Sequence, residues 1–150
     1  MTLEIRGGGE PAAYAKLAAQ AAKCGEGTVQ FLGSIAHGKV QDRFNAAGAF
    51  AMVSHRESFG MVYSEALLAG CPCLIGKGRG ISGYFEEESV VVAVDPKDGA
   101  AIEAGLERLC RDEAAFKDRL GTLMQSGGLD SLRQEGIAAT YKSALERSVA

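Results

Sequence analysis

The sequence predicts an α/β protein built on an open, mostly parallel sheet with helices on both faces. Three observations support this class. Strand-like and helical patterns alternate from one end of the 150 residues to the other. The connections are short, and many of the 20 glycines stand where an apolar run ends. The strand patterns are largely apolar, as in strands covered on both faces, so we expect parallel neighbours joined by crossover helices.

Short apolar runs predict the strands. They occupy residues 3–6, 28–32, 49–53, 73–75 and 90–94. Pro72 stands at the start of the fourth run, where a missing N–H group is tolerated. The last run, from Val90 to Val94, is continuously apolar, which is typical of a strand buried on both sides.

Apolar stripes at helical spacing predict the helices, over residues 11–24, 39–47, 61–69, 98–110, 116–124 and 132–145. Pro11 suits the first turn of its helix, since an N–H group there has no partner within the helix. Gly25, Gly48 and Gly70 each end a stripe, as glycine commonly does. Asp98 can cap the helix that follows it.

Composition limits the classes of function. Hydrophobic residues make up 47% of the chain, which predicts a single globular domain over residues 1–150. The net charge is −3 and the basic residues are scattered, so nucleic acid and an anionic membrane are not expected partners. No apolar stretch approaches the ~20 residues of a membrane span, and the N-terminus lacks a secretory core. We therefore expect a cytoplasmic location.

The cysteines and histidines predict no metal site. The cysteines have neither zinc spacing nor the spacing of a redox pair, and we interpret them as buried cytosolic thiols: Cys24, Cys71, Cys73 and Cys110. His37 and His55 are the only histidines, and neither has an acidic partner at metal-ligand spacing.

The stretch from Ser54 to Glu65 carries the strongest functional signal. A helix that starts near Met61 leaves the N–H groups of Gly60, Met61 and Val62 without helical partners, and these groups can bind a diphosphate. Glu57 on the loop and Glu65 inside the helix could hold paired sugar hydroxyls. The spacing of Glu57 and Glu65 does not by itself distinguish this role from that of two ordinary exposed acids.

Other loops are predicted at the same edge of the sheet, because ligands of open α/β sheets bind beyond the carboxyl ends of the strands. These are the loops at Gly7–Gly9, Gly33 and 76–83. Lys77 and Arg79 in the last loop could reach an anionic ligand, although exposed loop cations are the simpler interpretation.

A competing motif lies near the N-terminus. Gly7, Gly9 and Ala12 imitate the dinucleotide fingerprint of a nicotinamide-dependent oxidoreductase. That fingerprint needs an acid at the end of the next strand, where this chain has Phe31-Leu32-Gly33-Ser34. We interpret the motif as a tight strand–helix turn.

Several runs in chain order carry a resemblance to a known family: Phe31-Leu32-Gly33, Ser54-His55-Arg56-Glu57-Ser58-Phe59-Gly60-Met61-Val62, Glu65-Ala66-Leu67-Leu68-Ala69-Gly70-Cys71-Pro72 and Asp95-Pro96-Lys97-Asp98. Together they resemble the retaining glycosyltransferases of family four. In that family, two glutamates separated by seven residues lie in the C-terminal half of a GT-B fold, which is a Rossmann-like domain. The resemblance covers nearly the whole chain.

The resemblance implies roles for individual residues. Glu57 would be the candidate catalytic residue, an acid that orients the donor sugar, and Glu65 would bind the ribose. The backbone around the helix start would contact the sugar and the diphosphate: Ser58, Phe59, Gly60, Met61 and Val62. Ser34 and Ile35 would lie near the base. Transfer would proceed with retention and without a metal or other cofactor, from a UDP- or GDP-linked sugar to a saccharide or lipid-linked acceptor, as in polysaccharide biosynthesis.

The chain also departs from the family pattern. Val53-Ser54 stands where the family often has Pro-Ser, and nothing before Leu3 supplies the family's earlier strand and its basic loop. We interpret the chain as the donor-binding lobe without the acceptor-binding N-terminal lobe, so we expect donor binding without efficient catalysis. The alternative is a stand-alone nucleotide-binding or regulatory module. A homodimer through exposed apolar surface is a secondary expectation, and any peripheral membrane contact would come only through the full enzyme.

Overall fold

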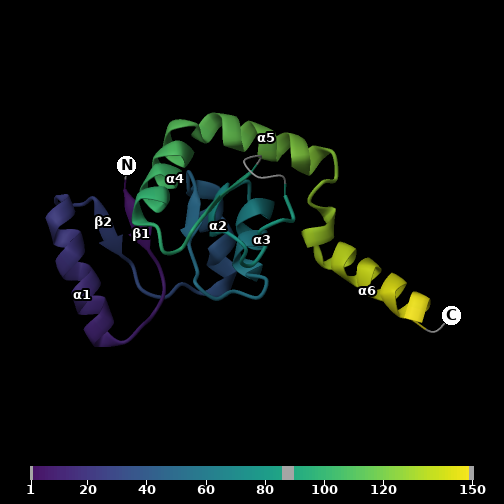
Figure 1. The fold of residues 1–150 in the computed structure, drawn as a ribbon, viewed down its shortest axis with the longest axis horizontal. Coiled ribbons are helices and arrows are strands. Elements are labelled where there is room, and N and C mark those ends of the chain that lie inside the picture. Colours follow the sequence, from purple (N-terminus) through teal and green to yellow (C-terminus); the bar gives the residue numbers. More distant parts are fainter. Residues whose placement is uncertain (1, 86–89, 149–150) are drawn as a thin grey trace. The chain divides into compact units, whose positions relative to one another are not determined.

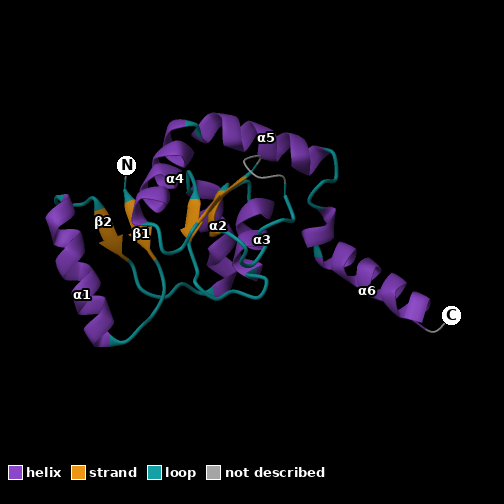
Figure 2. Cartoon of the chain, viewed as in Figure 1, coloured by secondary structure: helices purple, strands orange, loops and turns teal. Residues whose placement is uncertain are grey.

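The computed structural model describes residues 2–85 and 90–148 (Figure 1). Their contacts gather in two compact units, one ending at Val40 and the other beginning at Gln41. Helices and strands alternate along most of the chain (Figure 2), and all of the strand pairs are parallel. The predicted α/β class is therefore confirmed, while the prediction of a single domain over 1–150 stays a prediction.

The first unit consists of β1 (Leu3–Ile5), α1 (Pro11–Ala21), the 3₁₀ turn η1 (Ala22–Cys24), β2 (Val29–Phe31) and the 3₁₀ turn η2 (His37–Lys39). Strand β1 pairs with β2, and Ile5 lies opposite Phe31. Helix α1 begins at Pro11, as predicted. The Tyr14 ring packs on the Phe31 ring with centroids 4.8 Å apart, which joins the helix to the sheet.

The second unit contains all of α2 (Val40–Ala46) except its first residue. It continues with β3 (Phe50–Met52), α3 (Met61–Leu68), β4 (Cys73–Gly76), β5 (Val91–Val94), α4 (Gly99–Arg111), α5 (Glu113–Gln125), the 3₁₀ turn η3 (Asp130–Leu132) and α6 (Gln134–Ser148). The strands pair in the order β3-β4-β5. In the first unit β1 pairs with β2, so each unit has its own set of parallel strand pairs. Apolar periodicity locates the strands but does not specify which of their edges pair.

One face of the second sheet packs against α2 and α3. Side chains alternate between the two faces of a strand, and Phe50 lies opposite Cys73 on this face. The Phe50 ring contacts Phe44 of α2 and Tyr63 of α3, with centroids 5.1 and 5.9 Å away. These aromatic contacts hold both helices on the sheet.

The other face packs against α4 and α5. Leu74, Val92 and Val94 form a buried cluster with Leu109 of α4 and Phe116 of α5. The predicted cap of α4 is confirmed, since the Asp98 carboxylate accepts a hydrogen bond from the Ala101 amide at 3.0 Å. Helices thus lie on both faces of this sheet, as the continuously apolar β5 indicates.

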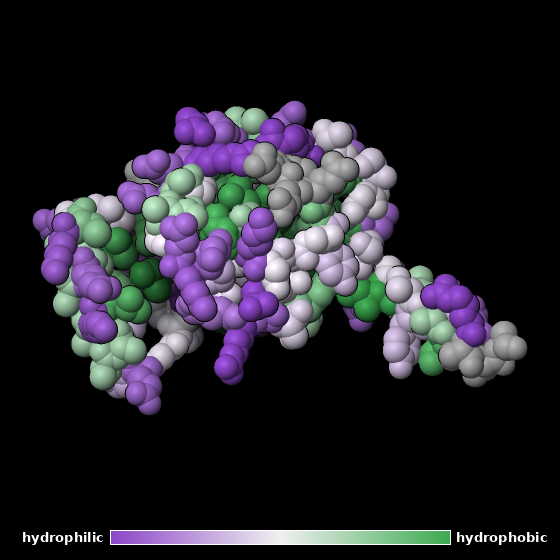
Figure 3. Space-filling view, viewed as in Figure 1, coloured by the Kyte–Doolittle hydropathy of each residue, from purple (hydrophilic) through white to green (hydrophobic). Residues whose placement is uncertain are grey.

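Two details differ from the sequence predictions. Leu132 was expected on the last helix but lies in η3, because the extended backbone of Arg133 separates this turn from α6. The Leu132 side chain is buried. Ile137, Tyr141 and Leu145 follow on α6 with exposed fractions of 53%, 68% and 50%, and Figure 3 shows hydrophobic residues among hydrophilic ones along this helix.

The second difference concerns the thiols. Cys71 and Cys73 are buried, but Cys24 and Cys110 are exposed, so the prediction that all four are buried was wrong. Cys24 follows α1, which has no buried residue, and Cys110 is adjacent to the fully buried Leu109 on α4. Within 2–85 and 90–148, no helix is both long enough and apolar enough to cross a membrane.

Candidate functional site

The loops that follow β3, β4 and β5 meet at the carboxyl edge of the second sheet. Gly76 ends β4, and a Cβ atom added to it would lie 2.7 Å from the Ser54 carbonyl oxygen and 3.1 Å from the Pro96 ring. Ser54 follows β3 and Pro96 follows β5. The close approach at Gly76 therefore gathers the three loops where ligands of parallel sheets bind.

Helix α3 starts at this edge, at Met61, as predicted. Gly60 precedes it with a left-handed φ of 78°, and its carbonyl accepts a hydrogen bond from the Tyr63 amide at 2.9 Å. Among the described residues, the amides of Gly60, Met61 and Val62 make no hydrogen bond. These N–H groups lie at the partially positive end of the helix, where an anion is stabilised.

Glu57 lies on the loop before α3 and is half-buried. Its carboxylate oxygen Oε1 accepts a hydrogen bond from the Ser58 amide at 3.0 Å. Its backbone carbonyl accepts a hydrogen bond from the Gly80 amide at 3.3 Å. The Glu57 backbone is thereby attached to the loop after β4.

Glu65 lies in the second turn of α3 and is also half-buried. Its carboxylate forms no ion pair or hydrogen bond with any residue that the structure describes. Both predicted acids thus belong to the strand–loop–helix segment at the sheet edge. In the same described ranges, no group of three or more His, Cys, Asp or Glu side chains is placed to hold a metal ion.

The glycine-rich loop after β4 is fastened to the Glu57 loop. The Arg79 guanidinium donates from Nε to the His55 carbonyl at 3.0 Å. Within the loop, the Gly78 amide donates to the Ser82 hydroxyl at 3.0 Å. Lys77 and Arg79 are exposed, as the simpler sequence interpretation expects, and Arg79 additionally joins two loops.

Tyr63 was not identified from the sequence. It is the third residue of α3 and only 1% exposed, and its hydroxyl donates to the Met52 carbonyl at 2.6 Å. Burial raises the pKa of Tyr63 above 10.0, and the charge on Glu57 adds to this rise, while an interaction with the Ser54 side chain offsets part of it. The hydroxyl therefore stays protonated at neutral pH. The available signal was an aromatic residue three positions after Gly60 on a helix of smaller side chains.

Ser34 and Ile35 belong to the first unit, where they follow β2. The Gly7 amide donates to the Gly33 carbonyl at 3.0 Å, and a Cβ atom on Gly8 would lie 3.5 Å from the Ser34 hydroxyl. The loops after β1 and β2 therefore meet at the carboxyl edge of the first sheet. This arrangement agrees with the sequence prediction for that pair of loops.

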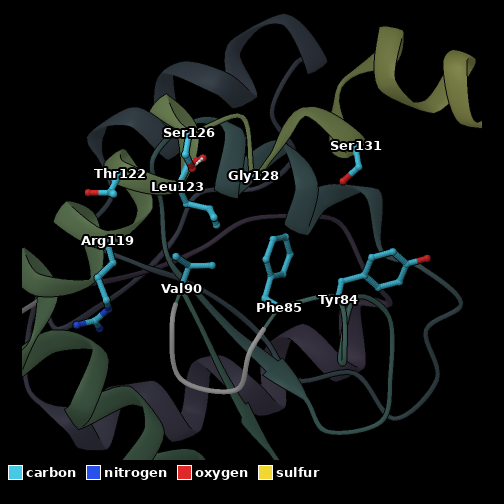
Figure 4. A pocket seen from close by; sticks show the side chains of 9 residues that line it. All are labelled: Tyr84, Phe85, Val90, Arg119, Thr122, Leu123, Ser126, Gly128 and Ser131. Carbon is cyan, nitrogen blue, oxygen red and sulfur yellow. Dashed lines mark hydrogen bonds between the residues drawn. The ribbon is translucent and has the colours of Figure 1, made fainter.

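A separate hollow of about 490 Å³ is lined by none of the predicted site residues (Figure 4). Its lining consists of Tyr84, Phe85, Val90, Arg119, Thr122, Leu123, Ser126, Gly128 and Ser131. Phe85 and Val90 flank residues 86–89, which lie outside the described ranges. We therefore assign this hollow no role.

Comparison with known proteins gives related sequences and folds. Residues 1–122 match the family described as glycosyl transferases group 1. The chain is 29% identical over 148 residues to a D-inositol 3-phosphate glycosyltransferase of Xylanimonas cellulosilytica, a match that covers 97% of this chain and 31% of that protein. A second such enzyme, from Thermomonospora curvata, is 32% identical over 103 residues, covering 69% of this chain and 23% of that protein. The chain thus spans less than a third of the length of these curated relatives.

Solved structures show the same fold. HepE of Anabaena in complex with UDP has a TM-score of 0.74 and 22% identity, and the match covers 95% of this chain and 41% of HepE. Sucrose-phosphate synthase of Thermosynechococcus elongatus has the same TM-score and identity, with 99% of this chain and 38% of the synthase covered. The fold is that of the C-terminal domain of a GT-B glycosyltransferase. The match over residues 1–122, most of the chain, shows that the chain belongs to the glycosyl transferases group 1 family.

Proposed function

We propose that the chain binds the nucleotide-diphosphate sugar donor of a retaining glycosyltransferase. The observation that carries the proposal is the start of α3, where the amides of Gly60, Met61 and Val62 make no hydrogen bond within the described residues. The acids Glu57 and Glu65 bracket these amides in sequence. Backbone donors suit a diphosphate, and carboxylates suit sugar and ribose hydroxyls.

Each residue has a distinct role in this proposal. Glu57 orients the donor sugar, Glu65 holds the ribose, and the backbone from Ser58 to Val62 contacts the sugar and the diphosphate. Ser34 and Ile35 contact the base. HepE, a protein of the same fold, has been crystallised with UDP and with UDP-glucose, which supports a donor of this chemical class.

Calorimetric titration with UDP, UDP-glucose and a GDP-linked sugar tests the proposal. Glu57→Gln should weaken UDP-glucose binding about tenfold and leave UDP binding nearly unchanged, because UDP lacks the sugar. Glu65→Gln should weaken both ligands by a similar factor, because both contain the ribose. Glu103→Gln, an exposed acid on α4, is the matched control. Folded wild-type chain that binds no nucleotide diphosphate would refute the proposal.

Retention without a metal ion is the proposed mode of transfer. The positive end of α3 can stabilise charge on the leaving diphosphate, a role that a metal ion would otherwise fill. Donor affinity should therefore be the same with and without EDTA. A loss of affinity in EDTA that Mg²⁺ restores would contradict this part of the proposal.

The acceptor half of the reaction lies outside the proposed role of this chain. We propose that it acts with an N-terminal acceptor lobe in the cytoplasm and contributes to polysaccharide or lipid-linked sugar synthesis. Any membrane contact would come through the full enzyme. The isolated chain should transfer sugar poorly, because transfer needs both reactants positioned. Efficient transfer by the purified chain alone would contradict this expectation.

Two alternatives have distinct outcomes. A stand-alone nucleotide-binding or regulatory module would bind UDP-glucose but gain no activity with any acceptor lobe. A nicotinamide-dependent oxidoreductase would bind NAD, which the family match does not indicate.

The homodimer remains a separate proposal. The first unit exposes Leu3, Leu17 and Leu32, with exposed fractions of 44%, 48% and 38%. A dimer formed through this surface would double the mass measured by light scattering, and a strictly monomeric mass would remove the proposal.

A further inference from the structure

Tyr63 connects helix α3 to the end of β3. Its hydroxyl donates to the carbonyl of Met52, the last residue of β3, with an oxygen–oxygen distance of 2.6 Å. A distance this short is that of a well-formed hydrogen bond. Because the side chain is 1% exposed, water does not readily replace this bond.

The Tyr63 ring also fills the space beside two glycines. A Cβ atom on Gly60 would lie 2.4 Å from ring atoms Cδ2 and Cε2, and one on Gly80 would lie 3.1 Å from Cε2. Both glycines have positive φ values, 78° and 56°, which other residues rarely adopt. These two positions therefore let the loop before α3 and the loop after β4 close onto the same ring.

The Glu57 side chain lies in the same packed space. Its Cγ atom would be 3.1 Å from a Cβ on Gly60 and 3.1 Å from a Cβ on Gly80. The Gly80 amide also donates to the Glu57 carbonyl at 3.3 Å. The position of the Glu57 carboxylate thus depends on the two glycines that contact the Tyr63 ring.

We propose that Tyr63 is a positioning residue that holds Glu57 and the free amides of α3 in place relative to the end of β3. Its effect on ligand binding rests on the proposed function, whereas its effect on the loops requires only the fold. Phenylalanine at this position would keep the ring packing but would leave the Met52 carbonyl without its donor. Tyr63→Phe therefore removes the hydrogen bond to the end of β3 and keeps the contact between the ring and Phe50.

Hydrogen exchange of the ligand-free chain tests the effect on the loops. Tyr63→Phe should speed amide exchange about tenfold at Ser58 and Gly80, whose amides donate to the carboxylate and the backbone carbonyl of Glu57, while amides of β4 and β5 keep their rates. Tyr141→Phe, at a 68% exposed position on α6, is the control and should change neither set. Unchanged loop exchange would overturn the proposal. An equal rise in β4 and β5 would also overturn it, because that result indicates general destabilisation.

Titration with UDP-glucose and UMP tests the effect on binding. Tyr63→Phe should lower UDP-glucose affinity about tenfold more than UMP affinity, because UMP lacks the sugar and the second phosphate. Faster loop exchange with unchanged UDP-glucose affinity would overturn the role in positioning Glu57. Wild-type chain that binds neither UDP nor UDP-glucose would refute the donor-binding function, while the exchange rates would still decide whether Tyr63 holds the loops.

Discussion

Replacing Gly60 with alanine tests the packing of the site with one methyl group. The new Cβ would lie 2.4 Å from the Tyr63 ring, at a residue whose φ is 78°. The left-handed backbone should cost about 1–2 kcal/mol, and forcing the ring and the Glu57 stem aside should cost about 1–3 kcal/mol more. Gly60→Ala should therefore lower the free energy of unfolding by about 2–5 kcal/mol, measured by urea unfolding followed by circular dichroism.

Gly70 is the matched control for this prediction. Its φ is 76°, but a Cβ added there would meet no atom within 4 Å. Gly70→Ala should therefore show only the backbone cost of about 1–2 kcal/mol.

A double-mutant cycle isolates the clash at Gly60. Tyr63→Val removes the clashing ring atoms, so Gly60→Ala in that background should cost about 1–3 kcal/mol less than in the wild type. Equal costs for Gly60→Ala and Gly70→Ala, or additive effects in the cycle, would refute the packing of Tyr63 against Gly60.

Three further predictions concern the framework of the second unit. Asp98→Ala removes the acceptor for the Ala101 amide and should lower the free energy of unfolding by about 1 kcal/mol; an unchanged urea midpoint would argue against this cap. Gly105→Ala places a methyl group 2.6 Å from Leu74 Cδ1 and should cost about 1–3 kcal/mol, so a higher Tm would contradict the packing of α4 on the sheet. Burial raises the pKa of the Cys71 thiol from 9.0 to about 11, so its stabilisation is complete below pH 9 and is lost as the pH rises to 11. Urea unfolding between pH 8 and 11 should show a decline that Cys71→Ala reduces by up to about 2 kcal/mol, and equal declines would show that Cys71 does not titrate in this way.

The positions of most elements were predictable because their signals are local. Pro11 marks the start of α1, Asp98 caps α4, and Gly70 follows the end of α3, as expected from each residue's own backbone preferences. The strand–loop–helix segment with its two acids follows from the same reasoning. The match to the glycosyl transferases group 1 family confirms that these motifs indicate a glycosyltransferase, and the retaining, family-four assignment stays a proposal.

The exposure of individual side chains was less predictable. Cys24 and Cys110 look like buried thiols in the sequence, yet they are exposed. Leu132 continues the apolar stripe of the last helix, yet it is buried in a separate turn. Both outcomes depend on which neighbours a side chain meets, and a residue's own preference does not contain that information.

Local patterns of apolar residues, glycines and capping residues predict the order of the strands and helices. They also predict the start of α3 at Met61 and the two acids on either side of it. Only the tertiary structure revealed that Gly80, twenty positions beyond Gly60 in the sequence, packs against the same Tyr63 ring as Gly60. It also revealed the hydrogen bond from Tyr63 to Met52 and the order in which β3, β4 and β5 pair. Such contacts join residues that are far apart in the chain, and they form only when packing brings whole elements together.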